Sequence, residues 1–213
     1  ERRMGDRKRS MKSSTYQYTK KRFGQNKGPR PFDAKNQNKD VKIPPVEKGV
    51  IRIIPLGGVE EIGKNMTAIE IGDDIIVIDA GMHFANETTP GVDYVIPNTT
   101  YLEEHKDKIR ALFITHGHLD HIGGVPLVLS RIGNPPVYSR NLSILMMRKR
   151  QAEFPHLAPL DIKIVEANDQ FIPISKDLKI CFFGVSHSIP DSTGIIIETP
   201  YGDIVNTGDV RIE

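Results

Sequence analysis

The stretch His116-Gly117-His118-Leu119-Asp120-His121 places three of the chain's seven histidines and one carboxylate within six residues. It directly follows the apolar, β-branched run at residues 112–115, which predicts a buried strand. Alternation along that strand sends His116 and His118 to the same side, and Asp120 and His121 lie where the chain turns into the next element. Imidazoles and a carboxylate that converge at a strand end are donors that a divalent ion such as zinc selects. We therefore expect a metal site here.

The composition limits the class of protein. The 213 residues are enough for one domain with a core and an additional tail. The single cysteine, Cys181, excludes a disulfide framework and a cysteine-based zinc site, and it favours a reducing compartment. No apolar run approaches the roughly 18 residues of a membrane span, and the polar N-terminus does not resemble a signal peptide. These features predict a cytoplasmic protein with no membrane contact. The start at Glu1 and the stop at Glu213 lead us to expect a chain cut from a longer one.

The charge is divided unevenly along the chain. Residues 1–50 carry 15 Lys and Arg against 5 Asp and Glu, whereas residues 51–213 carry 14 against 22. Because residues 1–49 contain few apolar side chains, we predict that they form a disordered basic extension of a domain at 50–213. The basic tail 1–48 indicates a nucleic-acid partner, with Tyr16, Tyr18, Phe23 and Phe32 available to stack on bases. A solubilising tail or a protein-docking segment is the alternative.

Hydrophobic patterning from residue 50 onward predicts an α/β (α+β) domain. Strands outnumber helices, and hairpins alternate with crossovers, so two packed mixed sheets with helices outside are expected. Residues 80–97 are expected to form a loop. The predicted helices are 101–109, 122–132 and 141–154, and the predicted strands are 50–56, 66–71, 75–79, 111–115, 137–138, 162–165, 177–184, 194–199 and 203–207.

Further metal donors follow other predicted strands. His187 and Asp209 each come just after an apolar run, and Asp79 closes one, so all three are expected at the same rim as the histidine stretch. Each is weak evidence alone, since an Asp before Gly is usual in turns. Together they supply three nitrogens for one ion, mixed donors for a second, and a bridging carboxylate. That is the donor set of a two-metal hydrolase.

The hexapeptide has the His-x-His-x-Asp-His signature of the metallo-β-lactamase superfamily. Further blocks occur in the same order as in the bacterial ribonuclease J family, a β-CASP group of that superfamily, which the chain resembles from about residue 50 to its end. These blocks are 56–65, 78–81, 91–97, 115–124, 187–192 and 206–209.

The resemblance implies the N-terminal portion of a metallo-β-lactamase αβ/βα sandwich. It implies zinc ligands as follows: His116, His118 and His187 for the first ion, Asp120 and His121 for the second, and Asp209 between the two. Asp120 and His121 would be the catalytic residues, Asp120 also orienting or deprotonating water, and Asp79 would support the ligand histidines from behind. Leu119 stands where the family commonly has an acidic residue. Some relatives also hold a structural Ca²⁺ near the positions of Gly91 and Asp93.

The implied activity is 5′-3′ exonuclease and endonuclease cleavage of single-stranded RNA, in mRNA decay and rRNA maturation. The resemblance implies two Zn²⁺ per complete subunit. It is compatible with homo-oligomers and with an RNA helicase or degradosome partner, which the sequence alone does not decide. It also implies a β-CASP domain and one more zinc-ligand histidine beyond Glu213, so the isolated chain is expected to bind zinc poorly and to cut little RNA. A thioesterase or lactamase of the same fold, and a non-catalytic RNA-binding paralogue, are the alternatives.

Overall fold

The histidine stretch, residues 116–121, follows a strand of a six-stranded mixed sheet. Its strands lie in the order β1 (Ile51–Gly57), β2 (Met66–Ile71), β3 (Asp74–Ile78), β6 (Ile109–Phe113), β7 (Val137–Ser139) and β8 (Ile162–Ile164). The pairs β1–β2 and β2–β3 are antiparallel, and β3, β6, β7 and β8 pair parallel. Parallel neighbours bring their carboxyl ends to one edge of the sheet, and Asp79 and the histidine stretch follow two such ends.

The computed structural model describes residues 43–85 and 91–212 of the chain. Pro44–Glu213 forms one compact unit. Residues 1–42 of the predicted basic tail lie outside the described residues, so its disorder and RNA contacts stay predictions. Residues 43–49, the end of that tail, are described, and the Val50 amide donates to the Glu47 carbonyl there. No helix in the described ranges is long and apolar enough to cross a membrane.

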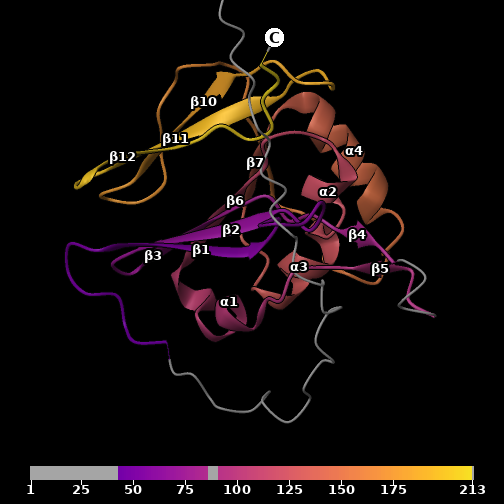
Figure 1. Ribbon diagram of the computed structural model, residues 1–213, viewed down its shortest axis with the longest axis horizontal. Helices are drawn as coiled ribbons and strands as arrows, with labels where there is room; N and C mark the ends of the chain where they lie inside the picture. The colour runs from indigo at the N-terminus through magenta and orange to yellow at the C-terminus, as the bar shows by residue number, and fades with distance from the viewer. Residues whose placement is uncertain (1–42, 86–90, 213) are drawn as a thin grey trace, which may run out of the picture. The chain divides into compact units, whose positions relative to one another are not determined.

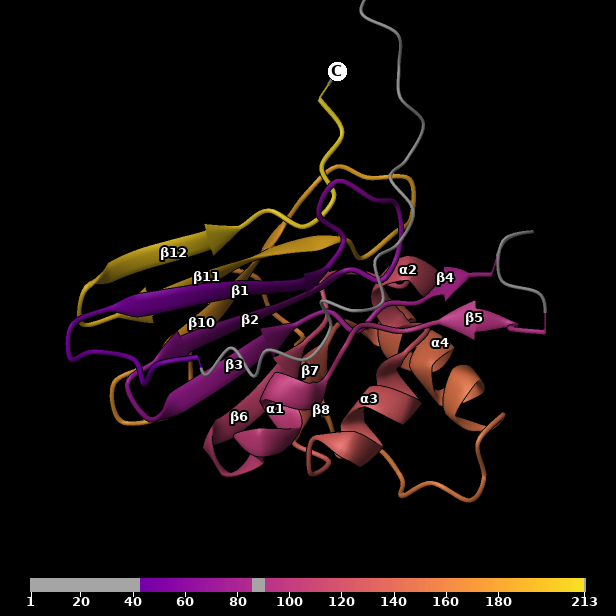
Figure 2. The same ribbon diagram turned by 60° about the horizontal axis from the view of Figure 1, so that its bottom comes forward.

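A second sheet covers one face of the first. It contains β9 (Ile172–Pro173), β10 (Lys179–Gly184), β11 (Thr193–Thr199) and β12 (Gly202–Asn206), in the order β12-β11-β10-β9 (Figures 1 and 2). Buried side chains of both sheets meet between them, including Ile76, Phe113 and Phe182. All three pairings within this sheet are antiparallel, so the expectation of two mixed sheets was wrong for this one.

The helices cover the opposite face of the first sheet. They are α1 (Thr100–Glu104), the 3-10 helix η2 (Lys106–Lys108), α2 (Leu119–Ile122), α3 (Val125–Arg131) and α4 (Asn141–Gln151). Alternation along β3 explains the layering, because Ile75 and Val77 join the core under the helices while Ile76 and Ile78 join the core between the sheets. The described residues therefore stack as helices, sheet, sheet.

Three sequence expectations needed correction. The predicted helix 101–109 is shorter: α1 ends at Glu104, the 3-10 helix η2 follows, and Ile109 is already the first residue of β6, paired with Ile75. The predicted helix 122–132 begins anew at Val125, with Pro126 in its first turn, where a missing amide hydrogen costs little. The expected loop 80–97 contains a short hairpin of β4 (His83–Phe84) and β5 (Tyr94–Val95).

Candidate metal centre

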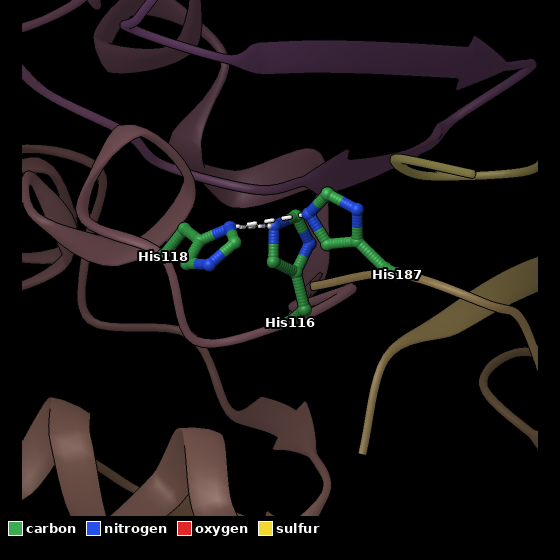
Figure 3. A group of neighbouring side chains, drawn as sticks. All are labelled: His116, His118 and His187. Atoms are coloured by element: carbon green, nitrogen blue, oxygen red, sulfur yellow. Dashed lines mark hydrogen bonds between the residues drawn. The ribbon is translucent and has the colours of Figure 1, made fainter. Parts of the chain in front are cut away.

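Three imidazoles converge beyond the ends of β6 and β10. Figure 3 shows His116, His118 and His187 turned toward one another. His118 Nδ1 is 3.0 Å from His116 Nε2 and 3.2 Å from His187 Nε2. The three rings thus offer ligand nitrogens that all lie within 4.8 Å of one another, a spacing and chemistry that fit one divalent ion.

A second donor group shares His116 and adds His121 and Asp209. The Asp209 Oδ2 atom lies 3.5 Å from His121 Nε2 and 3.7 Å from His187 Nε2, so this carboxylate faces both groups. Asp120 Oδ2 lies 3.6 Å from His121 Nε2 on the same side. The donors mix nitrogen and oxygen, which fits a second ion beside the first.

Asp79 contacts Thr115 and His121 on the side away from the converging ligand atoms. Its carboxylate accepts hydrogen bonds from the Thr115 amide (2.8 Å) and hydroxyl (2.8 Å), and it lies 2.8 Å from His121 Nδ1. Asp79 adopts a left-handed backbone (φ 59°), which aspartate tolerates better than most residues. This contact directs the Nε2 atom of His121 into the donor group, in the arrangement by which carboxylates orient ligand histidines.

The electrostatics divide the histidines into two kinds. Burial, reinforced by His121, lowers the pKa of His116 to about 4, and burial together with His187 lowers the pKa of His118. Burial opposes the charged form of His121 as well, but the Asp79, Asp120 and Asp209 carboxylates raise its pKa to about 9. At neutral pH His116 and His118 are unprotonated, so their lone pairs can bind a metal ion. His121 lies among carboxylates, whose negative charge attracts a cation.

Glycine permits the close approach of two segments behind the donors. Gly81 follows Asp79 by two residues, and a Cβ built on it would lie 1.6 Å from the carbonyl oxygen of Asp120. The Ala80 and Met82 amides donate to the His121 and Leu119 carbonyls across this contact. The loop after β3 is thereby bonded to the histidine stretch.

The sequence reasoning missed one residue of the site, and it also predicted a calcium site. Asn65, immediately before β2, lies 3.1 Å from Asp120 and 3.0 Å from His121. Its only sequence signal was its place at the end of the block 56–65. Among the described residues, the groups that could hold a metal do not include Asp93, so calcium near Gly91 and Asp93 stays a prediction.

An open pocket of about 330 Å³ adjoins the centre. It lies beside the loop after β1 and the end of β12, and its lining includes Gly58, Asn65, His121 and Asp209. A ligand in this pocket would therefore contact the second donor group directly.

The sequence model of the Metallo-beta-lactamase superfamily matches residues 59–213. The chain belongs to this superfamily, and the fold class predicted from the His-x-His-x-Asp-His signature is confirmed. Within it, the chain is similar to proteins named Ribonuclease J, which confirms the predicted resemblance. It is 43% identical to that of Mycoplasma pneumoniae over 168 residues, and 42% identical to that of Thermus thermophilus over 169. These alignments cover 79% and 76% of this chain, but it spans only 29% of the length of either relative.

Solved structures support the fold alone. A protein of unknown function from Enterococcus faecalis aligns with a TM-score of 0.57 and 18% identity, over 75% of this chain and 43% of that one. The metallo-beta-lactamase fold protein YhfI from Bacillus subtilis aligns with a TM-score of 0.51 and 17% identity, over 76% of this chain and 64% of that one.

Proposed function

We propose that the protein is a zinc-dependent ribonuclease that hydrolyses phosphodiester bonds of single-stranded RNA. The observation that carries the proposal is the convergence of two sets of donors at one edge of the fold. One set is the three imidazoles of His116, His118 and His187, and beside it lie His121, Asp120 and Asp209. The similarity to proteins named Ribonuclease J supports the choice of RNA over a small-molecule substrate.

In this proposal the first zinc ion would be held by His116, His118 and His187. Their three imidazoles bind zinc in preference to harder cations. The second would be held by Asp120 and His121. Asp209 would serve both, because its Oδ2 atom faces His121 and His187 at similar distances. When bound, such a pair of ions supplies an acidified water and neutralises charge on a phosphoryl group.

The chain's own residues prepare the site for that chemistry. His116 and His118 present unprotonated nitrogens at neutral pH because their pKa values are lowered. Asp79 fixes the ring of His121 through Nδ1. The side chain of Asp120 remains 34% exposed, so its carboxylate can reach an attacking water and accept its proton as a general base.

The proposal extends to more specific activities and partners. Exonuclease action from the 5′ end, internal cutting, and a cytoplasmic role in mRNA decay and rRNA maturation rest on the family resemblance. Homo-oligomers, a helicase or degradosome partner, and completion of the site by a β-CASP domain and a further histidine rest on it too.

The test uses the protein at its natural length. We expect elemental analysis to find two zinc ions per subunit. His116→Ala and Asp120→Ala should each lower cleavage of a labelled single-stranded RNA by more than about 100-fold, above the usual effect of residues that only support ligands. Circular dichroism should show both variants folded, and His156→Ala, an exposed histidine, should cleave normally.

Active enzyme without zinc, or near-normal turnover by either variant, would refute the proposal. Hydrolysis of a thioester or lactam without RNA cleavage would instead favour the small-molecule alternative.

A further inference from the structure

The main chain of Asn65 is fixed between two segments of the centre. Its amide donates to the carbonyl oxygen of Asp120 (2.9 Å), and its carbonyl accepts from the amide of Gly81 (2.9 Å). One bond reaches the start of α2 and the other the loop after β3. These two bonds fix the position of the Asn65 Cα atom relative to the donors, and its short side chain has few accessible conformations.

The carboxamide of Asn65 points at the second donor group. Its Nδ2 atom lies 3.1 Å from Asp120 Oδ2 and 3.0 Å from His121 Nε2. One N–H of the carboxamide can donate to the Asp120 carboxylate, whereas the Nε2 lone pair of His121 is the donor that the second ion would use. Among the residues that the structure describes, Asn65 supplies the side-chain N–H that holds the Asp120 carboxylate.

We propose that Asn65 is a positioning residue for the second metal ion, acting through Asp120. This inference rests on the proposed function, since it requires an ion between Asp120 and His121. The Asp120 carboxylate is one-third exposed, and without the Asn65 donor it keeps the longer contact, 3.6 Å, to His121 Nε2. An ion would then have to order the carboxylate itself, and that loss of side-chain entropy lowers affinity. The first ion, on three histidines that Asn65 does not contact, should be unaffected.

The experiment measures the two zinc affinities separately in the natural-length protein, by titrating zinc into metal-free protein against chelators of graded strength. Asn65→Ala and the similarly sized Asn65→Leu should each weaken the second ion 10- to 100-fold, as loss of a hydrogen-bond partner of a ligand typically does. The affinity of the first ion should change less than about twofold. Raising free zinc should restore turnover, because the variants lack an ion rather than a reacting group.

Thr67→Val is the matched control, since Thr67 lines the same pocket and should leave both affinities unchanged. Wild-type protein that binds fewer than two ions would overturn the proposed function and this inference with it. Two ions in the wild type with unaltered second-ion affinity in Asn65→Ala would overturn this inference alone. Equal weakening of both ions, with lower stability of the metal-free protein, would show a merely structural role.

Discussion

At the scale of single residues, His121 differs from the other clustered histidines because carboxylates surround it. Asp79 contacts its Nδ1 atom, and Asp120 and Asp209 lie on the Nε2 side. In metal-free protein His121 is protonated, and its positive charge partly offsets the three carboxylates in place of a metal ion. A divalent ion must displace that proton, which couples ion binding to pH.

This leads to a prediction for the metal-free protein. The pKa of His121 is about 9 in the folded state and about 6.5 when unfolded, so the folded state binds the proton more tightly. The resulting stability is fully present below pH 6.5 and is lost as pH rises through 9. Asp79→Asn should lower that pKa and so reduce the His121 contribution to the fall in unfolding free energy between pH 6 and 9. Urea denaturation at the two pH values measures it.

Asparagine suits this test because it also tolerates the left-handed backbone at position 79. Asp203→Asn, on the exposed part of β12, is the control and should retain the wild-type fall. An unchanged pH dependence in Asp79→Asn would contradict the role assigned to this carboxylate.

At the scale of elements, a buried carboxylate on β2 connects this strand to β1 and α1. Glu70 on β2 is only 2% exposed; its Oε2 atom lies 3.1 Å from Arg52 Nη1 and accepts a hydrogen bond from the Tyr101 hydroxyl. Burial, and then the bond to Glu70, raise the pKa of Tyr101. Arg52 also donates to the carbonyl of Pro44 (2.6 Å), which secures the chain just before β1.

Glu70→Ala should therefore lower the free energy of unfolding by about 1–3 kcal/mol, because it leaves the buried Tyr101 hydroxyl without its acceptor and Arg52 without its carboxylate. Glu198→Ala removes an exposed partner of Lys179 and should cost less than about 1 kcal/mol. Urea denaturation of both variants compares the two losses. Similar losses would show that the Glu70 network adds no more stability than a surface ion pair.

At the scale of the whole molecule, the division of charge suits a polyanionic substrate. Residues 51–213 carry an excess of acidic groups, some of them gathered at the centre, and residues 1–50 carry an excess of basic ones. An excess of negative charge repels a polyanion such as the proposed RNA substrate at long range. The basic tail is the part of the chain whose charge can offset this repulsion.

We predict that residues 1–48 are an RNA-affinity arm separate from catalysis. Deleting them should weaken binding to single-stranded RNA and flatten its salt dependence, since each neutralised phosphate contributes a slope of about −0.7 in log K against log salt. Zinc content should not change. Filter binding over a range of salt concentrations measures this; equal affinity and slope with and without the arm would favour a solubilising or docking role.

The local pattern of the sequence was enough to predict most strands and the ligand types. Runs such as 66–71 alternate or are apolar throughout, and burial of such runs in a sheet is a local consequence of their side chains. The histidine stretch was equally informative, because three imidazoles and a carboxylate in six residues already define a donor set.

Only the tertiary structure gave the contacts by which distant residues complete the centre, and it added Asn65 to those that the sequence predicted. Asp79 meets Thr115 and His121, which are 36 and 42 residues away, and Asn65 meets Asp120 across 55. Similarly, the pairing of Ile109 with Ile75 ended a helix that periodicity had extended too far. Periodicity reports which face of one element is buried. The contacts between elements depend on sheet order and close approach, which are set when the layers pack.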